Sequence, residues 1–260
     1  KENTIIDGGS ATNCVYIGNV NYDSQSNPIH MSGFTFQNGN SGGAGGIHIN
    51  WTPNVHLSDL IIKNNVSDGY NGAGGIFLQF YSNVILNDVI IENNTGYYAG
   101  AIAVGEWCGL DINNSMILHN YNWNYADESY PGGVALWGGS NASFHKVTIA
   151  FNQFAGIGIG HQNYNLTEIN VDISSSTLYG NEEEAIRSMY DVDAININVH
   201  NSILWANGVV SDLQASLNAS TGMFISYSNI GGDIDLNAGG LEFGDGVISE
   251  DPLFIDPWGM

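Results

Sequence analysis

The feature that most constrains this chain is that it repeats itself. The segment VHLSDLIIKNN at residues 55–65 has a near copy, VILNDVIIENN, at residues 84–94. Related segments that end in asparagine occur along most of the chain. Their terminal residues are Asn38, Asn64, Asn93, Asn120, Asn152, Asn181 and Asn207, so one unit is about 28 residues long. A period of this length is typical of proteins in which equivalent units stack along one axis.

Each unit contains three short strand patterns. A glycine-led strand, such as GGIHI at 45–49, is followed by a strand such as NVHLS at 54–58 and then by the segment that ends in asparagine. Apolar and polar residues alternate in these strands, and Gly, Asn, Asp and Ser separate them. Three short strands cannot bury a face alone, but each can pair with its equivalent about 4.8 Å away in the next unit. The repeat therefore predicts an all-β protein with the architecture of a parallel β-helix.

The alternation also predicts which side chains point inward. In GGIFLQ, Ile76 and Leu78 are expected to face the core, whereas Phe77 and Gln79 face solvent. Aligned asparagines in successive coils can hydrogen-bond along the stack and can adopt the left-handed backbone of a tight bend. We interpret the asparagine column as structural.

These motifs resemble a known architecture. A GG[IV]-x-[ILV] strand followed by an I-x-x-N strand, as at 61–64 and 90–93, is similar to the repeats of polymorphic outer-membrane proteins and related secreted bacterial β-helix proteins. More broadly, the chain resembles the pectate-lyase-like superfamily, and SEDPLFIDPWG at 249–259 resembles the segment that closes the helix in large secreted members. The resemblance implies a right-handed parallel β-helix of about seven to eight coils over residues 1–232, with a capping or linker segment over 233–260. It implies a fold rather than an activity, because this fold serves many functions.

The resemblance also assigns the strands to sheets. The glycine-led strands form the first sheet, the NVHLS type forms the second, and the strands ending in asparagine form the third. Asp59, Asp88 and Asn114 then lie at the bend between the second and third sheets. In members of known activity, substrate lies over the first sheet.

Charge limits the classes of partner. The chain has 4 Lys and Arg against 26 Asp and Glu, a formal net charge of −22. Such a surface repels nucleic acid and anionic lipid, and acidity can also simply keep a secreted protein soluble. No apolar run approaches the ~20 residues of a membrane helix. Cys14 and Cys108 are expected several coils apart and therefore free. We expect a monomer located outside the cell or on a bacterial cell surface.

The outer face of the first sheet is the candidate ligand site. In the middle coils the outward positions are small residues such as Ala103, Ala135 and Gly158, which predicts a shallow trough for a flat ligand; alternatively, small residues merely suit a flat sheet. Aromatic side chains in the neighbouring turns, including the insertion YNWNYADESYP at 121–131, could stack on sugar rings or fold over their own coil. The predicted ligand contacts are Phe77, Gln79, Trp107, Tyr121, Trp123, Tyr125, Trp137 and Arg187.

Acidic residues beside this trough suggest two further hypotheses. Glycoside hydrolysis needs two carboxylates across the bond, and the nearest candidates are Glu106, Asp127 and Glu128, with His161 as a proton-transfer group. Separately, Glu183, Asp191 and Asp193 could hold Ca²⁺, although they show no fixed calcium-loop spacing and a solvated acidic rim is the simpler interpretation.

Lyase chemistry is disfavoured. Polysaccharide lyases of this fold use a Lys or Arg base with cationic partners on the first sheet, and here Arg187 is the only basic residue expected there. The polygalacturonase-like set of clustered aspartates, GHG and RIK is absent. Three hypotheses remain: a non-catalytic module that binds a polysaccharide or surface glycan or acts in adhesion, a glycoside hydrolase on a neutral polysaccharide, and a purely structural stalk.

Overall fold

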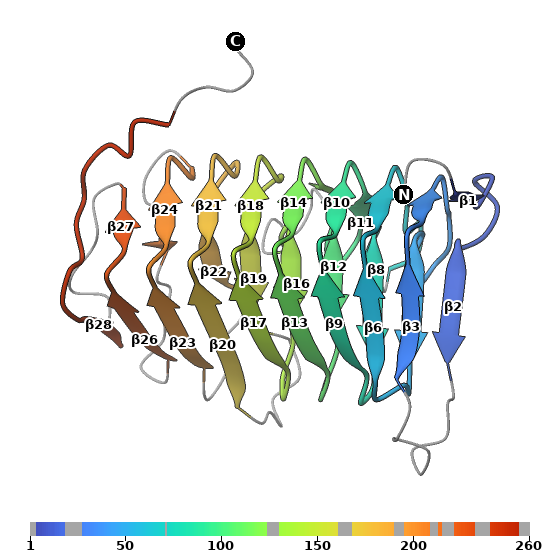
Figure 1. Cartoon of the computed structure of the whole chain (residues 1–260), viewed down its shortest axis with the longest axis horizontal. Helices are drawn as coiled ribbons and strands as arrows, with labels where there is room; N and C mark the ends of the chain where they lie inside the picture. The colour runs from blue at the N-terminus through green and yellow to red at the C-terminus, as the bar shows by residue number, and fades with distance from the viewer. Residues whose placement is uncertain are drawn as a thin grey trace.

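A computed structural model describes residues 4–18, 28–70, 72–123, 130–160, 168–189, 195–208, 213–214, 221–231 and 240–254. Over these residues the chain is an all-β parallel solenoid of about seven turns, as the repeat predicts. Each turn contributes one strand to each of three parallel sheets, and equivalent strands lie side by side along one long axis (Figure 1).

The three sheets follow the predicted assignment. Within the described ranges, the first sheet contains β2 (Val15–Gly18), β5 (Ile47–Asn50), β8 (Ile76–Gln79), β12 (Ile102–Val104), β16 (Val134–Leu136), β19 (Ile157–Ile159), β22 (Ile186–Ser188) and β25 (Leu213–Gln214). The second contains β3 (Ile29–Ser32), β6 (Val55–Ser58), β9 (Asn83–Asn87), β13 (Gly109–Asn113), β17 (Asn141–His145), β20 (Ile169–Ser174), β23 (Ile195–His200), β26 (Thr221–Ser226) and β28 (Leu241–Phe243). The third contains β1 (Ile5–Asp7), β4 (Thr35–Gln37), β7 (Ile61–Lys63), β10 (Ile90–Glu92), β14 (Met116–Leu118), β18 (Thr148–Ala150), β21 (Thr177–Tyr179), β24 (Ile203–Trp205) and β27 (Asn229–Ile230). A small extra sheet pairs β11 (Thr95–Gly96) with β15 (Tyr121–Asn122).

One apolar core runs along the axis inside the three sheets. Ile76 and Leu78 of β8 are fully buried in it, as the alternation predicts, and they pair with Ile47 and Ile49 of the preceding coil. Because equivalent positions stack, each coil buries the same face against its neighbours. Burial of one such side chain stabilises the fold by about 1.5–3 kcal/mol.

The asparagine column forms, but its register differs from the prediction in the early coils. The buried ladder consists of Asn65, Asn94, Asn120, Asn152, Asn181 and Asn207. The predicted Asn64 and Asn93 lie one position before it, are exposed and adopt φ of 56°. Asn38 likewise has φ of 55°, and Gly39 takes the ladder position after it. The prediction for these three coils is therefore wrong by one residue, because a bend asparagine precedes the position that faces the core.

The bend between the second and third sheets lies where the resemblance implied. Asp59, Asp88 and Asn114 have φ of 52°, 56° and 49°. In some coils a buried serine follows this bend and caps the preceding coil; for example, Ser115 Oγ accepts from Val89 N–H at 3.0 Å. Both bends thus satisfy buried backbone groups with side chains from the next coil.

Three further predictions concern the two cysteines, the division of the chain at residue 232 and membrane helices. Cys14 and Cys108 are free, as expected. β28 pairs with β26, so the second sheet continues beyond residue 232; the division of the chain at that point stays a prediction. Among the described residues, no helix has the length and apolar character needed to cross a membrane.

Candidate binding groove on the second sheet

The predicted row on the first sheet has the expected register but does not form an open trough. Strand pairing places Ala103 between Phe77 and Ala135. Both alanines are fully buried, and Phe77 and Trp137 are only 3% and 6% exposed. The predictions of a bare floor in the middle coils and of a solvent-facing Phe77 are therefore wrong, because other side chains cover this face.

The cover is a second apolar cluster outside the main core. It contains Ala44, Ala73, Phe77, Ala99, Ala103, Tyr130, Ala135, Trp137 and Met189, with Tyr97 and Tyr98 packed against it. The ring centroid of Tyr98 lies 4.3 Å from that of Trp137 and 5.2 Å from that of Tyr130. Aromatic side chains that could have faced a ligand thus bury one another and the small residues beneath them.

Other predicted ligand contacts are engaged within the protein. Trp123 donates its Nε1–H to the carbonyl of Ser67 at 2.7 Å, and Gln79 Oε1 lies 3.2 Å from His48 Nε2. Tyr121 lies in β15 and is 45% exposed. Their roles as ligand contacts stay predictions.

Arg187 is held by two carboxylates. Its Nη2 lies 2.7 Å from Glu184 Oε2 and also contacts Glu183 Oε2. Burial raises the pKa of the Glu184 carboxyl, and the Arg187 guanidinium opposes that shift in part. Glu183, a predicted calcium ligand, therefore already has a cationic partner.

The remaining acidic predictions have few described members. Glu106 lies in the turn before Trp107 and is half-buried. Asp127, Glu128, Tyr125, His161, Asp191 and Asp193 lie outside the described residues. No group of three potential metal ligands occurs among the residues that the structure does describe.

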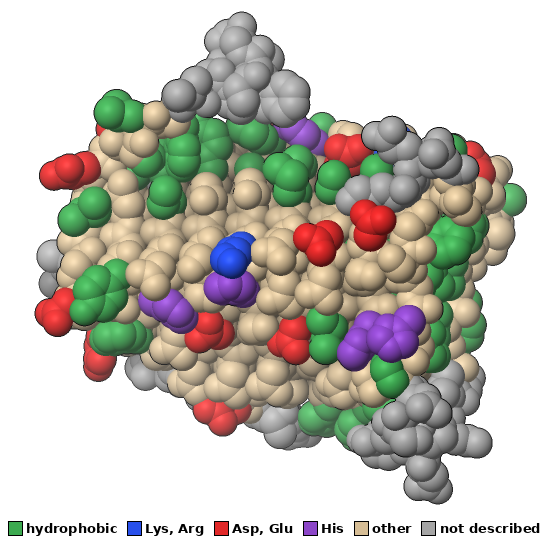
Figure 2. All heavy atoms as spheres, viewed as in Figure 1, with side chains coloured by type: hydrophobic (Ala, Val, Ile, Leu, Met, Phe, Trp, Pro, Cys, Tyr) green, Lys and Arg blue, Asp and Glu red, His purple; other side chains and the backbone are tan. Residues whose placement is uncertain are grey.

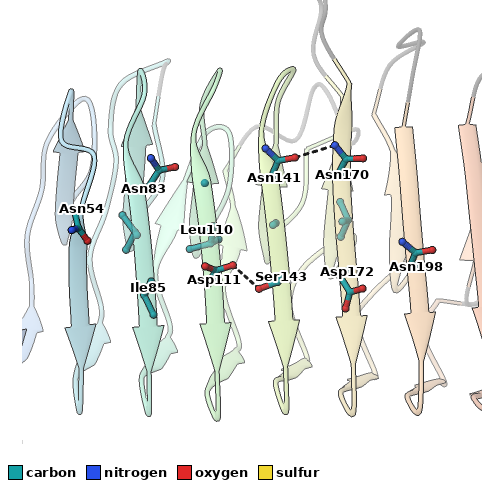
Figure 3. A pocket seen from close by; sticks show the side chains of 14 residues that line it. Asn54, Asn83, Ile85, Leu110, Asp111, Asn141, Ser143, Asn170, Asp172 and Asn198 are labelled. Carbon is teal, nitrogen blue, oxygen red and sulfur yellow. Dashed lines mark hydrogen bonds between the residues drawn. The ribbon is translucent and has the colours of Figure 1, made fainter. Parts of the chain in front are cut away.

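A groove does occur, on the outer face of the second sheet. It has a volume of about 440 Å³ and crosses the strands from β9 to β23, so it runs along the solenoid axis (Figure 3). Its lining residues are Asn54, Asn83, Val84, Ile85, Gly109, Leu110, Asp111, Asn141, Ala142, Ser143, Asn170, Val171, Asp172 and Asn198. A smaller hollow of about 260 Å³, which shares Asn198, continues it toward β28.

Two rows of polar groups form the groove surface. Asn170 Nδ2 donates to Asn141 Oδ1 at 3.0 Å, and Asn196 Nδ2 donates to Asn170 Oδ1 at 3.1 Å. In the second row, Ser143 Oγ donates to Asp111 Oδ1 at 2.6 Å. Figure 3 shows the Asn141–Asn170 and Asp111–Ser143 pairs on the same face of the sheet. The hydrogen bonds within the first row hold its amides in place and leave their other donors and acceptors facing solvent.

Gly109 makes room in the first row. Strand pairing places it between Asn83 and Asn141. A Cβ at Gly109 would lie 2.4 Å from Asn83 Oδ1, so a side chain there would push into the space that the groove now occupies. The groove depends in part on this missing side chain.

The charge of the groove is negative. Asp111 and Asp172 line it, and its lining includes no Lys or Arg. Figure 2 shows acidic side chains scattered over the face that carries the second and third sheets. The groove therefore disfavours anionic ligands and suits neutral ones that offer many hydrogen-bonding groups.

Exposed aromatic residues lie at the turns that lead into this sheet. Trp51 and Trp107 are 43% and 41% exposed, and Tyr81 lies between them. The centroid distances are 5.1 Å for Trp51 to Tyr81 and 5.3 Å for Tyr81 to Trp107. We call these three residues the aromatic row. Asn83 and Gly109 of the groove each follow a member of the row by two residues.

The sequence did not lead to this groove, because the resemblance places ligands over the first sheet. Its pattern was nevertheless present: the NVILN, GLDIN, NASFH and NVDIS segments begin with Asn83, Gly109, Asn141 and Asn170. Trp107, a predicted ligand contact, lies in the turn between β12 of the first sheet and β13 of the second, and its role stays a prediction. No protein-family model matches this chain, and neither a curated protein nor a solved structure matches it.

Proposed function

We propose that this protein is a non-catalytic glycan-binding module, located outside the cell or on a bacterial cell surface, and that its ligand lies in the groove on the second sheet. The observation that carries the proposal is the double row of amide, hydroxyl and carboxylate groups in a groove of about 440 Å³. Adhesion to a surface glycan would be one use of such a module.

The chemistry of the lining favours sugars. An asparagine amide both donates and accepts, and a carboxylate accepts from up to two hydroxyls, so these groups match the hydroxyl pairs of a sugar ring. Asn141, Asn170 and Asn198 offer such amides on three neighbouring strands. In the second row, Ile85 pairs with Asp111 and supplies apolar surface for the C–H groups of the ring.

The charge narrows the class of glycan. Asp111 and Asp172, together with the net charge of −22, would repel an acidic polysaccharide unless cations intervened. Nucleic acid is disfavoured for the same reason. A neutral glycan meets no such penalty.

Binding without hydrolysis suits the geometry better than catalysis. Glycosidases place their two carboxyl groups on either side of the scissile bond. Asp111 and Asp172 rise from the same face of one sheet, with β17 between their strands (Figure 3). Their strands are two spacings of about 4.8 Å apart, which is at the upper limit of the separation of about 6.5–9.5 Å in inverting glycosidases, and both carboxylates can accept hydrogen bonds from a ligand on this face.

A glycan array combined with a reducing-sugar assay tests the proposal. We expect a neutral glycan to bind without release of new reducing ends. Simultaneous Asn141→Ala and Asn170→Ala should weaken binding by roughly ten-fold or more, because several hydrogen bonds to the ligand are lost. Thr177→Ala, on the outer face of the third sheet, is the control and should bind as the wild type does.

Three results would contradict the proposal. Product release would favour the hydrolase, and the absence of binding to any glycan would favour the structural stalk. Glycan binding that ignores the Asn141 and Asn170 substitutions would place the site elsewhere.

A further inference from the structure

The members of the aromatic row lie at the bend that precedes the second-sheet strand in successive coils; Trp51 lies four residues before Val55, whereas Tyr81 lies three residues before the partner of Val55, Val84. The residues that follow them are joined by a repeating hydrogen bond: Asn83 N–H donates to Thr52 O at 3.2 Å, Gly109 N–H to Ser82 O at 2.9 Å, and Asn141 N–H to Cys108 O at 3.0 Å. By the same register, the residue of the next coil at the row position is Gly139. Four coils can therefore be compared at one site.

That site requires a left-handed backbone, for which glycine is the least strained residue. The φ angles are 51° at Trp51, 53° at Tyr81, 55° at Trp107 and 73° at Gly139. Large aromatic residues are costly in this region, and Gly139 shows that the bend itself needs no side chain. Trp51 and Trp107 are also exposed and Tyr81 is half-buried, so the core does not require these rings either. Strained and exposed aromatic residues in one row point to a role in binding.

The end of the row offers an uncovered ring face. Tyr81 and Trp107 stack with an angle of 8° between their planes, so one face of the Trp107 indole is covered. In the described part of the chain, Tyr81 is the only aromatic residue in ring contact with Trp107. On the other side, the next coil has Gly139, which brings no ring. Within the described residues no second ring covers the other indole face, and Trp107 is 41% exposed beside the coil that contributes Asn141 to the groove.

The row and the groove run in the same direction. Both cross successive coils, and neighbouring strands are spaced by about 4.8 Å along the axis. Asn54, Asn83 and Gly109 line the groove two or three residues after Trp51, Tyr81 and Trp107, respectively. A ligand in the groove would therefore lie over the polar rows, with the aromatic row along the edge nearer the first row.

We propose that the groove and the aromatic row form one binding track, and that its ligand is an extended, unbranched, β-linked chain of neutral hexoses lying along the solenoid axis with about one sugar per coil. The proposal rests on the proposed glycan-binding function and names the class of glycan. Successive sugars of an extended β-linked chain are spaced much as the strands are, so each sugar meets an equivalent set of groups. An α-linked chain coils and loses this match.

Oligosaccharides of increasing length test whether the spacing of the sugars matches the spacing of the strands. Cello- and manno-oligosaccharides from the disaccharide to the hexasaccharide, with malto-oligosaccharides of the same lengths, would be titrated by calorimetry. We expect the affinity of at least one β-linked series to rise with each added sugar, and every malto-oligosaccharide to bind more weakly than its β-linked counterpart. Affinity that is independent of length, or equal for the two linkages, would overturn the inference.

A matched pair of variants tests the aromatic row. Trp107→Gly copies Gly139 of the next coil, and the control Phe151→Gly copies Gly180, which precedes the next ladder asparagine. Phe151 is a suitable control because it is also exposed and has φ of 56°, but it lies at a different bend, where its ring stacks on His119 and meets Tyr179 edge-on. We expect Trp107→Gly to weaken hexasaccharide binding by about ten-fold. Phe151→Gly should bind as the wild type does.

The outcomes separate this inference from the proposed function. If glycans bind in a manner sensitive to Asn141 and Asn170 but not to length or to Trp107→Gly, the inference fails and the proposed function stands. If no glycan binds, both fail. Should Trp107→Gly not fold, acrylamide quenching of the wild type provides the test: the hexasaccharide should shield tryptophan fluorescence, and unchanged quenching would overturn the inference.

Discussion

Asn94 donates both its backbone N–H and its side-chain Nδ2–H to one oxygen, Oδ1 of Asn120, at 3.0 and 3.1 Å. The same double donation joins Asn65 to Asn94 and continues through Asn152, Asn181 and Asn207. Each Nδ2 also reaches a strand carbonyl, such as Ile62 O for Asn94 at 2.9 Å. A ladder of this kind satisfies the buried polar groups of one bend with the side chains of the next coil.

Removal of one asparagine from the buried ladder should destabilise the fold strongly. Asn94→Ala removes the acceptor of two buried donors of Asn65, and each unsatisfied buried group costs about 1–3 kcal/mol. We expect the free energy of unfolding, measured with urea, to fall by about 3 kcal/mol or more. The adjacent control is Asn93→Gly, which keeps the left-handed bend and should change stability by about 0.5 kcal/mol or less. Equal losses for the two variants would contradict the ladder register.

A side chain at Gly109 should block the groove without harm to the fold. Gly109→Asn places an amide beside the flexible end of Asn83, which can move aside, and restores the pattern seen at Asn141. We expect glycan affinity to fall by roughly ten-fold, because the ligand loses the space it would occupy. The unfolding midpoint should stay near that of the wild type. Asn113→Gln, at the other end of β13 and outside the groove lining, is the control for both measurements.

Cys108 should be unreactive in the folded protein. Burial raises the pKa of its thiol to about 12, so only a trace of the reactive thiolate exists at neutral pH. Iodoacetamide followed by mass spectrometry should leave Cys108 unmodified in the native protein and modify it fully in urea. Cys14, which is half-buried, is the internal comparison. Rapid native labelling of Cys108 would show that the turn after Trp107 opens.

The stability of the wild type relative to Glu184→Gln should depend on pH. Because burial raises the pKa of Glu184, the folded state binds this proton more tightly than the unfolded state does. The contribution of Glu184 therefore favours folding below its unfolded pKa of 4.5 and is lost as pH rises toward its higher folded value. Glutamine keeps an acceptor for Arg187 without a charge to desolvate.

Urea unfolding at pH 4.5 and pH 7 measures this difference. We expect the wild type to lose stability relative to Glu184→Gln as pH rises. Glu183→Gln removes the other carboxylate at Arg187 and serves as the comparison. A difference that stays constant with pH, or that moves in the opposite direction, would show that Arg187 outweighs burial at this site.

The inward-facing residues of each strand were predictable because side chains alternate between its two faces. In a strand, alternate residues face opposite sides, so Ile76 and Leu78 had to share a face, and equivalent residues of the next coil had to pair with them. The asparagine column was predictable in kind but not in register for the early coils. Asn93 and Asn94 are adjacent, and either could stand at the bend. Where a single asparagine follows another residue type, as Asn120 follows His119, the register could be read directly.

The solenoid, its three sheets and its acidic surface follow from local periodicity and composition and were therefore predictable. Which outer face is free depends on how the turns fold. Tyr97, Tyr98 and Tyr130 come from turns whose path no repeat specifies, and they fold over the first sheet and bury its small residues. The second sheet has no such cover over Asp111 or Asn141, which remain exposed. The repeat predicts which strands pair with each other. The conformation of an irregular turn depends instead on contacts between residues that are distant in the sequence.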